Sequence, residues 1–147
     1  MTDYLESNVM GKVIQKAKLQ NIADVVYYEK GDIEKDQINE INVNFLVDTG
    51  ASMICLPPDL IEKLKLFPLC ERNARTATGI VKRMIYSAVR LNVLDREGDF
   101  NVMELSEGVQ PLLGYIPLQA LDLVVNVPNE RLEGNPEHNG EFVLYQL

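Results

Sequence analysis

The residues best able to do chemistry form the triplet Asp48-Thr49-Gly50, which directly follows the apolar segment Phe45-Leu46-Val47. We expect that segment to be a strand that presents the Asp48 carboxylate at its end. Gly50 allows a sharp backbone turn, and the Thr49 hydroxyl can hydrogen-bond backbone groups across it. Such a triplet arises by chance in roughly one chain in twenty of this length, and an ordinary strand-ending turn uses the same residues. It is therefore a candidate catalytic site that needs support from its context.

Other reactive groups give weaker signals. Phosphoryl-transfer enzymes also place Asp at a strand end, but they need a second acidic residue two positions on or a Lys directly after, and here those positions are Gly50 and Thr49. His138 lies in a polar segment, where we expect an exposed side chain without a catalytic role. No residue is assigned to a metal site, and no cofactor is expected.

Two cysteines and one basic pair also have plain interpretations. Cys55 and Cys70 lack the CxxC spacing of a redox or zinc site, so we expect reduced, partly buried thiols. Lys82-Arg83 is most simply a solvated face, although it would also favour acidic residues in a substrate.

Short apolar segments of period two surround the triplet and favour β structure. The predicted strands lie at 25–28, 41–47, on both sides of 76–79, at 85–93, 100–105, 123–125 and 142–145. A short helix is predicted after Pro57-Pro58-Asp59 and a helical turn at 118–121, with a turn at 95–98 and a polar tail at 129–140. The fold class is mainly β: a small closed or partly open β-barrel with one or two short helices, in a single domain over 1–147.

Composition restricts the partners. The net charge of −8 and the pI near 4.6 argue against a nucleic-acid partner, because that binding depends on clustered Lys and Arg. The N-terminal residues are acidic and no apolar run approaches the length of a membrane span, so we expect no membrane partner and a cytoplasmic protein.

The order of three segments resembles the retroviral-type (retropepsin-like) aspartic protease family, in a single-lobe, prokaryote-like form. Val47-Asp48-Thr49-Gly50-Ala51 matches the active-site loop, Ala77-Thr78-Gly79-Ile80 resembles the tip of a flap hairpin, and Leu112-Leu113-Gly114 matches the second signature. The resemblance covers about 42–125 and implies a barrel of the acid-protease type with one lobe per chain. Many retroviral members carry Asp and Arg where this chain has Ser52 and Tyr115, so a supporting ion pair is missing.

The resemblance implies a role for each matching residue. Asp48 is the catalytic carboxylate, Thr49 supports the carboxylate pair, and Gly50 approaches the substrate backbone. Substrate binding is expected from Ala51, Ser52, Ala77, Thr78, Gly79 and Ile80. Packing behind the active-site loop is expected from Leu112, Leu113 and Gly114.

The mechanism requires two carboxylates, whereas the sequence has one Asp-[Ser/Thr]-Gly triplet. The second carboxylate must then come from another chain, so we expect a homodimer that cleaves an extended peptide or protein substrate. The terminal segments 9–13 and 142–145 are the candidates for strands that pair between subunits. The alternative is a non-catalytic dimeric β-barrel that binds peptides or acts as a scaffold.

Overall fold

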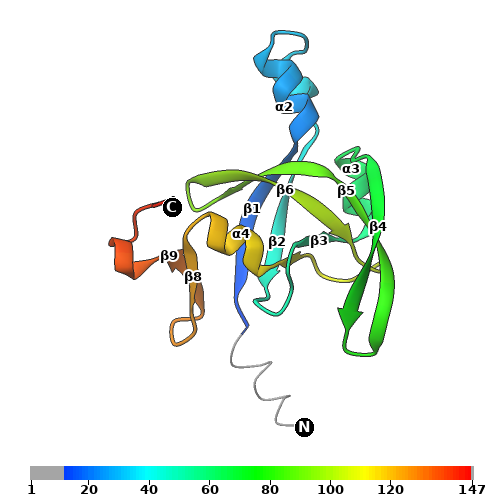
Figure 1. The fold of residues 1–147 in the computed structure, drawn as a ribbon. Helices are drawn as coiled ribbons and strands as arrows, with labels where there is room; N and C mark the ends of the chain where they lie inside the picture. The colour runs from blue at the N-terminus through cyan, green and yellow to red at the C-terminus, as the bar shows by residue number, and fades with distance from the viewer. Residues whose placement is uncertain (1–11, 147) are drawn as a thin grey trace.

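The computed structural model describes residues 12–146 and is built mainly from β-strands, as the sequence predicts (Figure 1). The strands are β1 (Ile14–Asn21), β2 (Glu40–Val47), β3 (Ile54–Leu56), β4 (Pro68–Thr76), β5 (Gly79–Val93), β6 (Arg96–Glu104), β7 (Leu112–Leu113), β8 (Leu123–Asn126) and β9 (Arg131–Gly134). The helices are α2 (Ile22–Glu29), α3 (Pro58–Lys63) and α4 (Tyr115–Ala120), with 3₁₀ turns η1 (Lys35–Gln37) and η2 (Pro136–His138).

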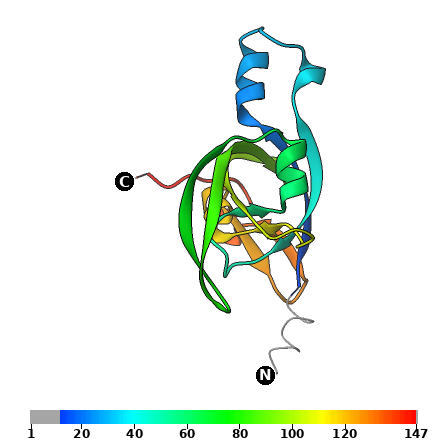
Figure 2. The same ribbon diagram turned by 90° about the vertical axis from the view of Figure 1, so that its right-hand side faces the viewer.

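The main sheet closes into a ring. Its strands follow the order β1-β2-β7-β3-β6-β5-β4, and β1 also pairs with β5, so that every strand except β4 belongs to the ring. The β2–β7 and β3–β6 pairs are parallel and the other pairs are antiparallel. Figure 2 shows the curved sheet wrapped around the core, with the hairpin of β4 and β5 extending away from it. The closed ring is consistent with the mainly β, closed or partly open fold that the alternating pattern predicts.

Alternation along β2 shows how the sequence specifies the ring. Val43, Phe45 and Val47 point inward and are buried, while Asn42 and Asn44 point outward and are exposed. Successive side chains of a strand face opposite sides, so this pattern admits only one register. Burial of Phe45 and the aliphatic core it contacts is the main stabilising contribution.

The helices near the site lie where the sequence predicts them. Helix α3 begins at Pro58, where the missing N–H is harmless, and α4 begins at Tyr115, a few residues before the predicted turn. The turn between β5 and β6 is Leu94-Asp95, with φ of 49° and 64°, so the prediction of a turn at 95–98 is shifted by one to three residues.

The predicted strand at 25–28 is wrong, because these residues lie in helix α2. The side chain of the preceding residue, Asn21, accepts a hydrogen bond from Ala23 N at 2.9 Å and caps the helix. Of the helical residues only Val25 is buried, so Tyr27 and Tyr28 do not have the packed sheet face that favours aromatic residues in strands.

The C-terminal part also differs from the prediction. Residues 131–134 of the polar tail form β9, which pairs with β8 and buries Leu132. The predicted strand at 142–145 is absent within this chain, because Phe142 packs against the Arg96 guanidinium and Val143 N donates to the Asp122 carboxylate. Of the other predicted pairing segment, residues 9–11 lie outside the described residues.

Candidate active site

The Asp48 loop is a tight turn closed by its own backbone. Asp48 N donates to Leu113 O at 3.0 Å, and Ala51 N donates back to Asp48 O at 3.0 Å. Gly50 N donates to Asp48 Oδ1 at 2.9 Å, so the carboxylate is oriented by the residue two positions on. Asp48 is half-buried, whereas Thr49 and Gly50 are exposed. The strand end therefore presents the carboxylate at the surface, as the sequence predicts.

A second segment lies directly behind this loop. Strand β7 pairs with β2 in parallel and with β3 in antiparallel fashion, which places it between the two strands that flank the loop. The next three residues, Gly114, Tyr115 and Ile116, donate backbone hydrogen bonds to Met53 O at 3.0 Å, Ala51 O at 2.9 Å and Ser52 O at 3.0 Å, respectively.

Gly114 fits because it lacks a side chain. A Cβ atom there would lie 2.6 Å from Met53 N and Met53 O, which is too close for any real contact. The backbones of the loop and of the segment behind it are thus in direct contact. Leu112, Leu113 and Gly114 thus lie directly behind the loop, and their role as its support stays a prediction.

The hairpin of β4 and β5 has its tip at the predicted residues. Thr76 pairs with Gly79, so Ala77 and Thr78 form the connecting turn. Thr76 Oγ1 donates to Gly79 O at 2.8 Å and accepts from Thr78 N at 3.3 Å, while Gly79 has φ of +126°. Ile80 next to the tip is 59% exposed. The hairpin extends freely from the barrel (Figure 1), and its movement over a peptide stays a prediction.

A groove of about 520 Å³ lies between the Asp48 loop and the base of this hairpin, and we call it the loop–hairpin groove. Ser52 and Met53 line it from the loop, and Ile116 lines it from α4. Its other walls include Cys70, Arg72, Ile85 and Met103. The structure thus brings Ser52 beside the hairpin base, whereas the tip residues 77–80 do not line this groove.

Cys55 lies next to the loop and is buried. The pKa of its thiol is raised to about 11, mainly by burial and also by the negative charge of Asp48, while the positive charge of Arg83 opposes the rise. The thiol is therefore protonated at neutral pH, which fits a packing role and not a nucleophile. Both cysteines are free, as predicted.

The predicted exposure of His138 is wrong, because its side chain is only 17% exposed. Its Nδ1 atom lies 2.6 Å from the carboxylate of Asp122, and its Nε2 atom lies 3.1 Å from the Tyr145 hydroxyl. Burial favours a higher pKa for Asp122, but the hydrogen bonds from His138, Asn135 and the Val143 backbone outweigh it and lower the pKa below 3.8. One signal in the sequence is the position of Asp122 inside the apolar run 118–125, because a buried carboxylate needs donors.

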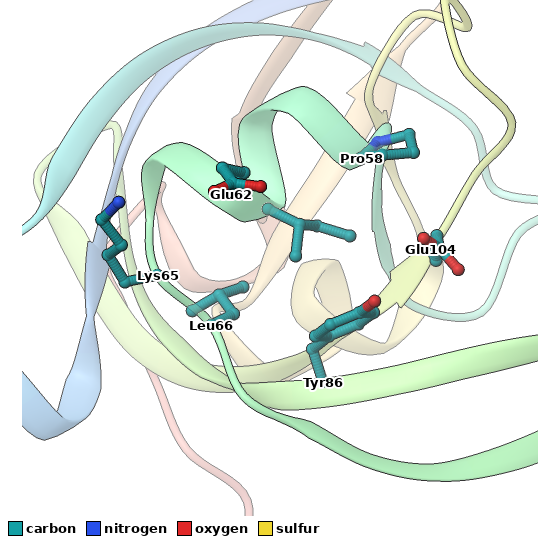
Figure 3. A pocket seen from close by; sticks show the side chains of 7 residues that line it. Pro58, Glu62, Lys65, Leu66, Tyr86 and Glu104 are labelled. Atoms are coloured by element: carbon teal, nitrogen blue, oxygen red, sulfur yellow. The ribbon is translucent and has the colours of Figure 1, made fainter.

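A second groove of about 430 Å³ lies beside α3 and contains none of the predicted site residues (Figure 3). It is lined by Glu62, Lys65, Tyr86, Glu104 and apolar residues of α3. The pKa of Tyr86 is raised by burial and by the nearby Glu104 carboxylate. None of the residues that line this groove takes part in the contacts of the Asp48 loop.

Two further observations concern the part of the chain that the structure describes. Residues 12–146 contain no group of three or more His, Cys, Asp or Glu side chains arranged to hold a metal ion. None of the helices between residues 12 and 146 has the length and the apolar character needed to cross a membrane.

Comparison with known proteins gives one family match. Residues 35–120, more than half of the chain, match the family described as gag-polyprotein putative aspartyl protease. No curated protein matches the chain. Among solved structures, the chain is similar to the EIAV protease complexed with the inhibitor HBY-793, with 21% sequence identity and a TM-score of 0.44. That match covers 53% of this chain and 75% of the EIAV protease chain.

Proposed function

The chain belongs to the gag-polyprotein putative aspartyl protease family, and on that premise we propose that it is an aspartic endopeptidase that acts as a homodimer. The observation that carries the proposal is the Asp48 loop. It presents one half-buried carboxylate and is supported from behind by the backbone of Gly114.

The dimer follows from the number of carboxylates. Each chain supplies one such loop, so a two-fold axis that passes beside Thr49 would bring two Asp48 side chains together. The exposure of Thr49 and Gly50 on the isolated chain supports this arrangement, since both are available to a second subunit.

Two carboxylates that lie this close share one proton, because ionising both is costly; aspartic proteases are the familiar example of this behaviour. The ionised Asp48 takes a proton from a water molecule, which attacks the scissile carbonyl carbon. The protonated partner donates a hydrogen bond to the developing oxyanion and then gives its proton to the leaving nitrogen. The protein's own groups therefore account for the complete proton transfer.

The substrate would be an extended peptide lying along the loop–hairpin groove. In the part of the chain that the structure describes, β4 is the one strand of the main sheet outside the closed ring, and it pairs only with β5. Its other edge offers backbone groups to a further strand, which is how many proteins bind extended peptides. Ala51 and Ser52 would contact the peptide from the loop side, and residues 77–80 would cover it from the hairpin tip.

Asp48→Asn tests the proposal. The amide cannot accept the proton of the water, so we expect peptidase activity on unfolded protein substrates to be lost while folding and dimerisation are retained. Activity would be measured at mildly acidic and neutral pH, and dimerisation by sedimentation. Retained turnover in this variant would refute the protease assignment. A wild-type dimer that binds peptides without cleaving them would instead support the non-catalytic module.

A further inference from the structure

We propose that the loop–hairpin groove selects substrates with an acidic side chain, which Arg72 and Arg83 of the hairpin bind. This inference rests on the proposed endopeptidase function and adds the substrate class. It is supported by the charge of the hairpin, by the face on which the two arginines lie and by the lining of the groove.

The hairpin is a basic element in an acidic chain. Residues 68–83 contain four of the 14 Lys and Arg residues, namely Arg72, Arg75, Lys82 and Arg83, but only one of the 22 Asp and Glu residues, Glu71. The chain as a whole has a net charge of −8. A local positive potential at the element that borders the groove attracts anionic groups that the remaining surface repels.

The register of the hairpin places Arg72 and Arg83 on the same face. They are cross-strand partners in the β4–β5 ladder, and the next pair along the same face is Cys70 and Ile85. Cys70, Ile85 and Arg72 line the groove, whereas Arg83 does not, so this face of the hairpin borders the groove. Lys82 and Asn73 form the alternate pair on the outward face, and both are exposed.

The position of Arg83 agrees with this orientation. Its side chain is half-buried, unlike that of Lys82, and its positive charge opposes the rise in the pKa of the buried Cys55 thiol. Like charges that face each other across a ladder are destabilising. An anion between the two guanidinium groups would remove that repulsion.

Neither arginine is neutralised by a carboxylate of the described residues. No ion pair of Arg72 or Arg83 is present among residues 12–146, and the one hydrogen bond of the Arg72 guanidinium is to the carbonyl of its neighbour Glu71 at 3.3 Å. Guanidinium groups bind carboxylates through paired N–H donors, and neither arginine uses these donors on a carboxylate between residues 12 and 146.

The lining of the groove favours a glutamate side chain. None of its lining residues carries a carboxylate, and Met53, Ile85, Met103 and Ile116 provide apolar walls. A glutamate side chain has a methylene stem for these walls and a carboxylate for the arginine at the rim. A lysine or arginine side chain would meet like charge in the same place.

Paired peptides test the inference. A peptide that the wild-type enzyme cleaves is made in versions with Glu or Gln at each position on both sides of the scissile bond, and kcat/KM is measured at pH 6. At one or two positions the Glu peptide should be cleaved about tenfold faster, the scale of one charge-assisted contact. Raising the salt concentration should reduce this ratio, because the contact is partly exposed.

Matched variants identify the residues responsible. Arg72→Gln and Arg83→Gln should each bring the Glu-to-Gln ratio toward one, because kcat/KM falls more for the Glu peptide than for the Gln peptide. Lys82→Gln removes the same charge from the outward face and should leave the ratio at its wild-type value. A ratio near one in the wild type, or a ratio that neither arginine variant changes, would overturn the inference.

The same peptides separate this inference from the proposed function. If the wild type cleaves no peptide, the endopeptidase assignment fails, and the affinity of fluorescent Glu and Gln peptides then decides the inference alone. Tighter binding of the Glu peptide that is lost in Arg83→Gln would support the acidic subsite. Equal binding of both peptides would refute it.

Discussion

Replacing Gly114 with Ala tests whether the Asp48 loop depends on the segment behind it. The new Cβ would lie 2.6 Å from the backbone of Met53, where ordinary contacts begin at 3.4 Å, so the two backbones must separate by about 0.8 Å. Overpacking of this kind costs about 1–3 kcal/mol. The three backbone hydrogen bonds from residues 114–116 to the loop would lengthen, and each contributes about 0.5–1.5 kcal/mol.

The expected total is about 3 kcal/mol, which for a domain of this size lowers the melting temperature by roughly 6–12 °C. Denaturant unfolding and thermal melting measure this directly. Peptidase activity should fall further than the folded fraction accounts for, because the loop that carries Asp48 moves with its support. Unchanged stability together with full activity would show that the close contact at Gly114 is not needed.

Gly50→Ala is the matched control. A Cβ at Gly50 would meet only the Asp48 Oδ1 atom, at 3.2 Å, and no backbone atom. We therefore expect stability within about 1 kcal/mol of wild type but a clear loss of activity, because the carboxylate loses its orientation. If Gly50→Ala were more destabilising than Gly114→Ala, the close contact at Gly114 would not be the main support of the loop.

Three further predictions concern the hairpin tip, the C-terminal network and assembly. Gly79→Val should slow turnover several-fold with little change in melting temperature, because φ of +126° is strained for a β-branched residue at a tip that must move. A lower melting temperature with unchanged kinetics would show that Gly79 has only a structural role. Asp122→Asn should lower stability at pH 7. Its difference in stability from wild type should shrink as the pH falls below 3.8, because Asp122, with its lowered pKa, stabilises the fold only while it is ionised. A difference that grows in acid would contradict this. Dimerisation should tighten as the pH falls and as the salt concentration rises. The reason is that each dimer would carry a formal charge of twice −8 and two Asp48 side chains that repel when both are ionised. A tight dimer whose sedimentation depends on neither pH nor salt would refute this prediction.

The parts of the site that sequence reasoning placed correctly are those fixed by local pattern. Alternating residues place Asp48 at the end of β2, and two apolar residues before Gly114 form β7 between β2 and β3. Both features depend on the period-two burial rule and on the small size of glycine, which can be read from a few neighbouring residues. The catalytic and binding roles of these residues stay predictions.

The parts that were missed depend on contacts between distant segments. Val25 to Tyr28 have strand-forming side chains, but Asn21 is anchored through its amide to Leu64 O and caps a helix instead. The prediction that His138 is exposed failed because its partner, Asp122, lies 16 residues earlier in the sequence. Local composition does not identify the partner in either pairing, since each partner is brought in by the folded chain.

The C-terminal segment bears on how the proposed dimer would be built. Within one chain, the Arg96 guanidinium donates to Leu121 O at 2.6 Å, Asp122 O at 2.8 Å and Gly140 O, and it stacks on Phe142. If this segment were exchanged as a strand between subunits, Phe142 would have to leave the buried Arg96 guanidinium. The guanidinium would then also lose its hydrogen bond to the Gly140 carbonyl. The segment after Gly140 is thus held by its own subunit, and an interface built from the Asp48 loops does not require it. Truncation after Gly140 should lower the melting temperature of the monomer more than it weakens dimerisation. If sedimentation instead shows a large loss of dimer and melting shows little change, an interface built from exchanged strands would be supported.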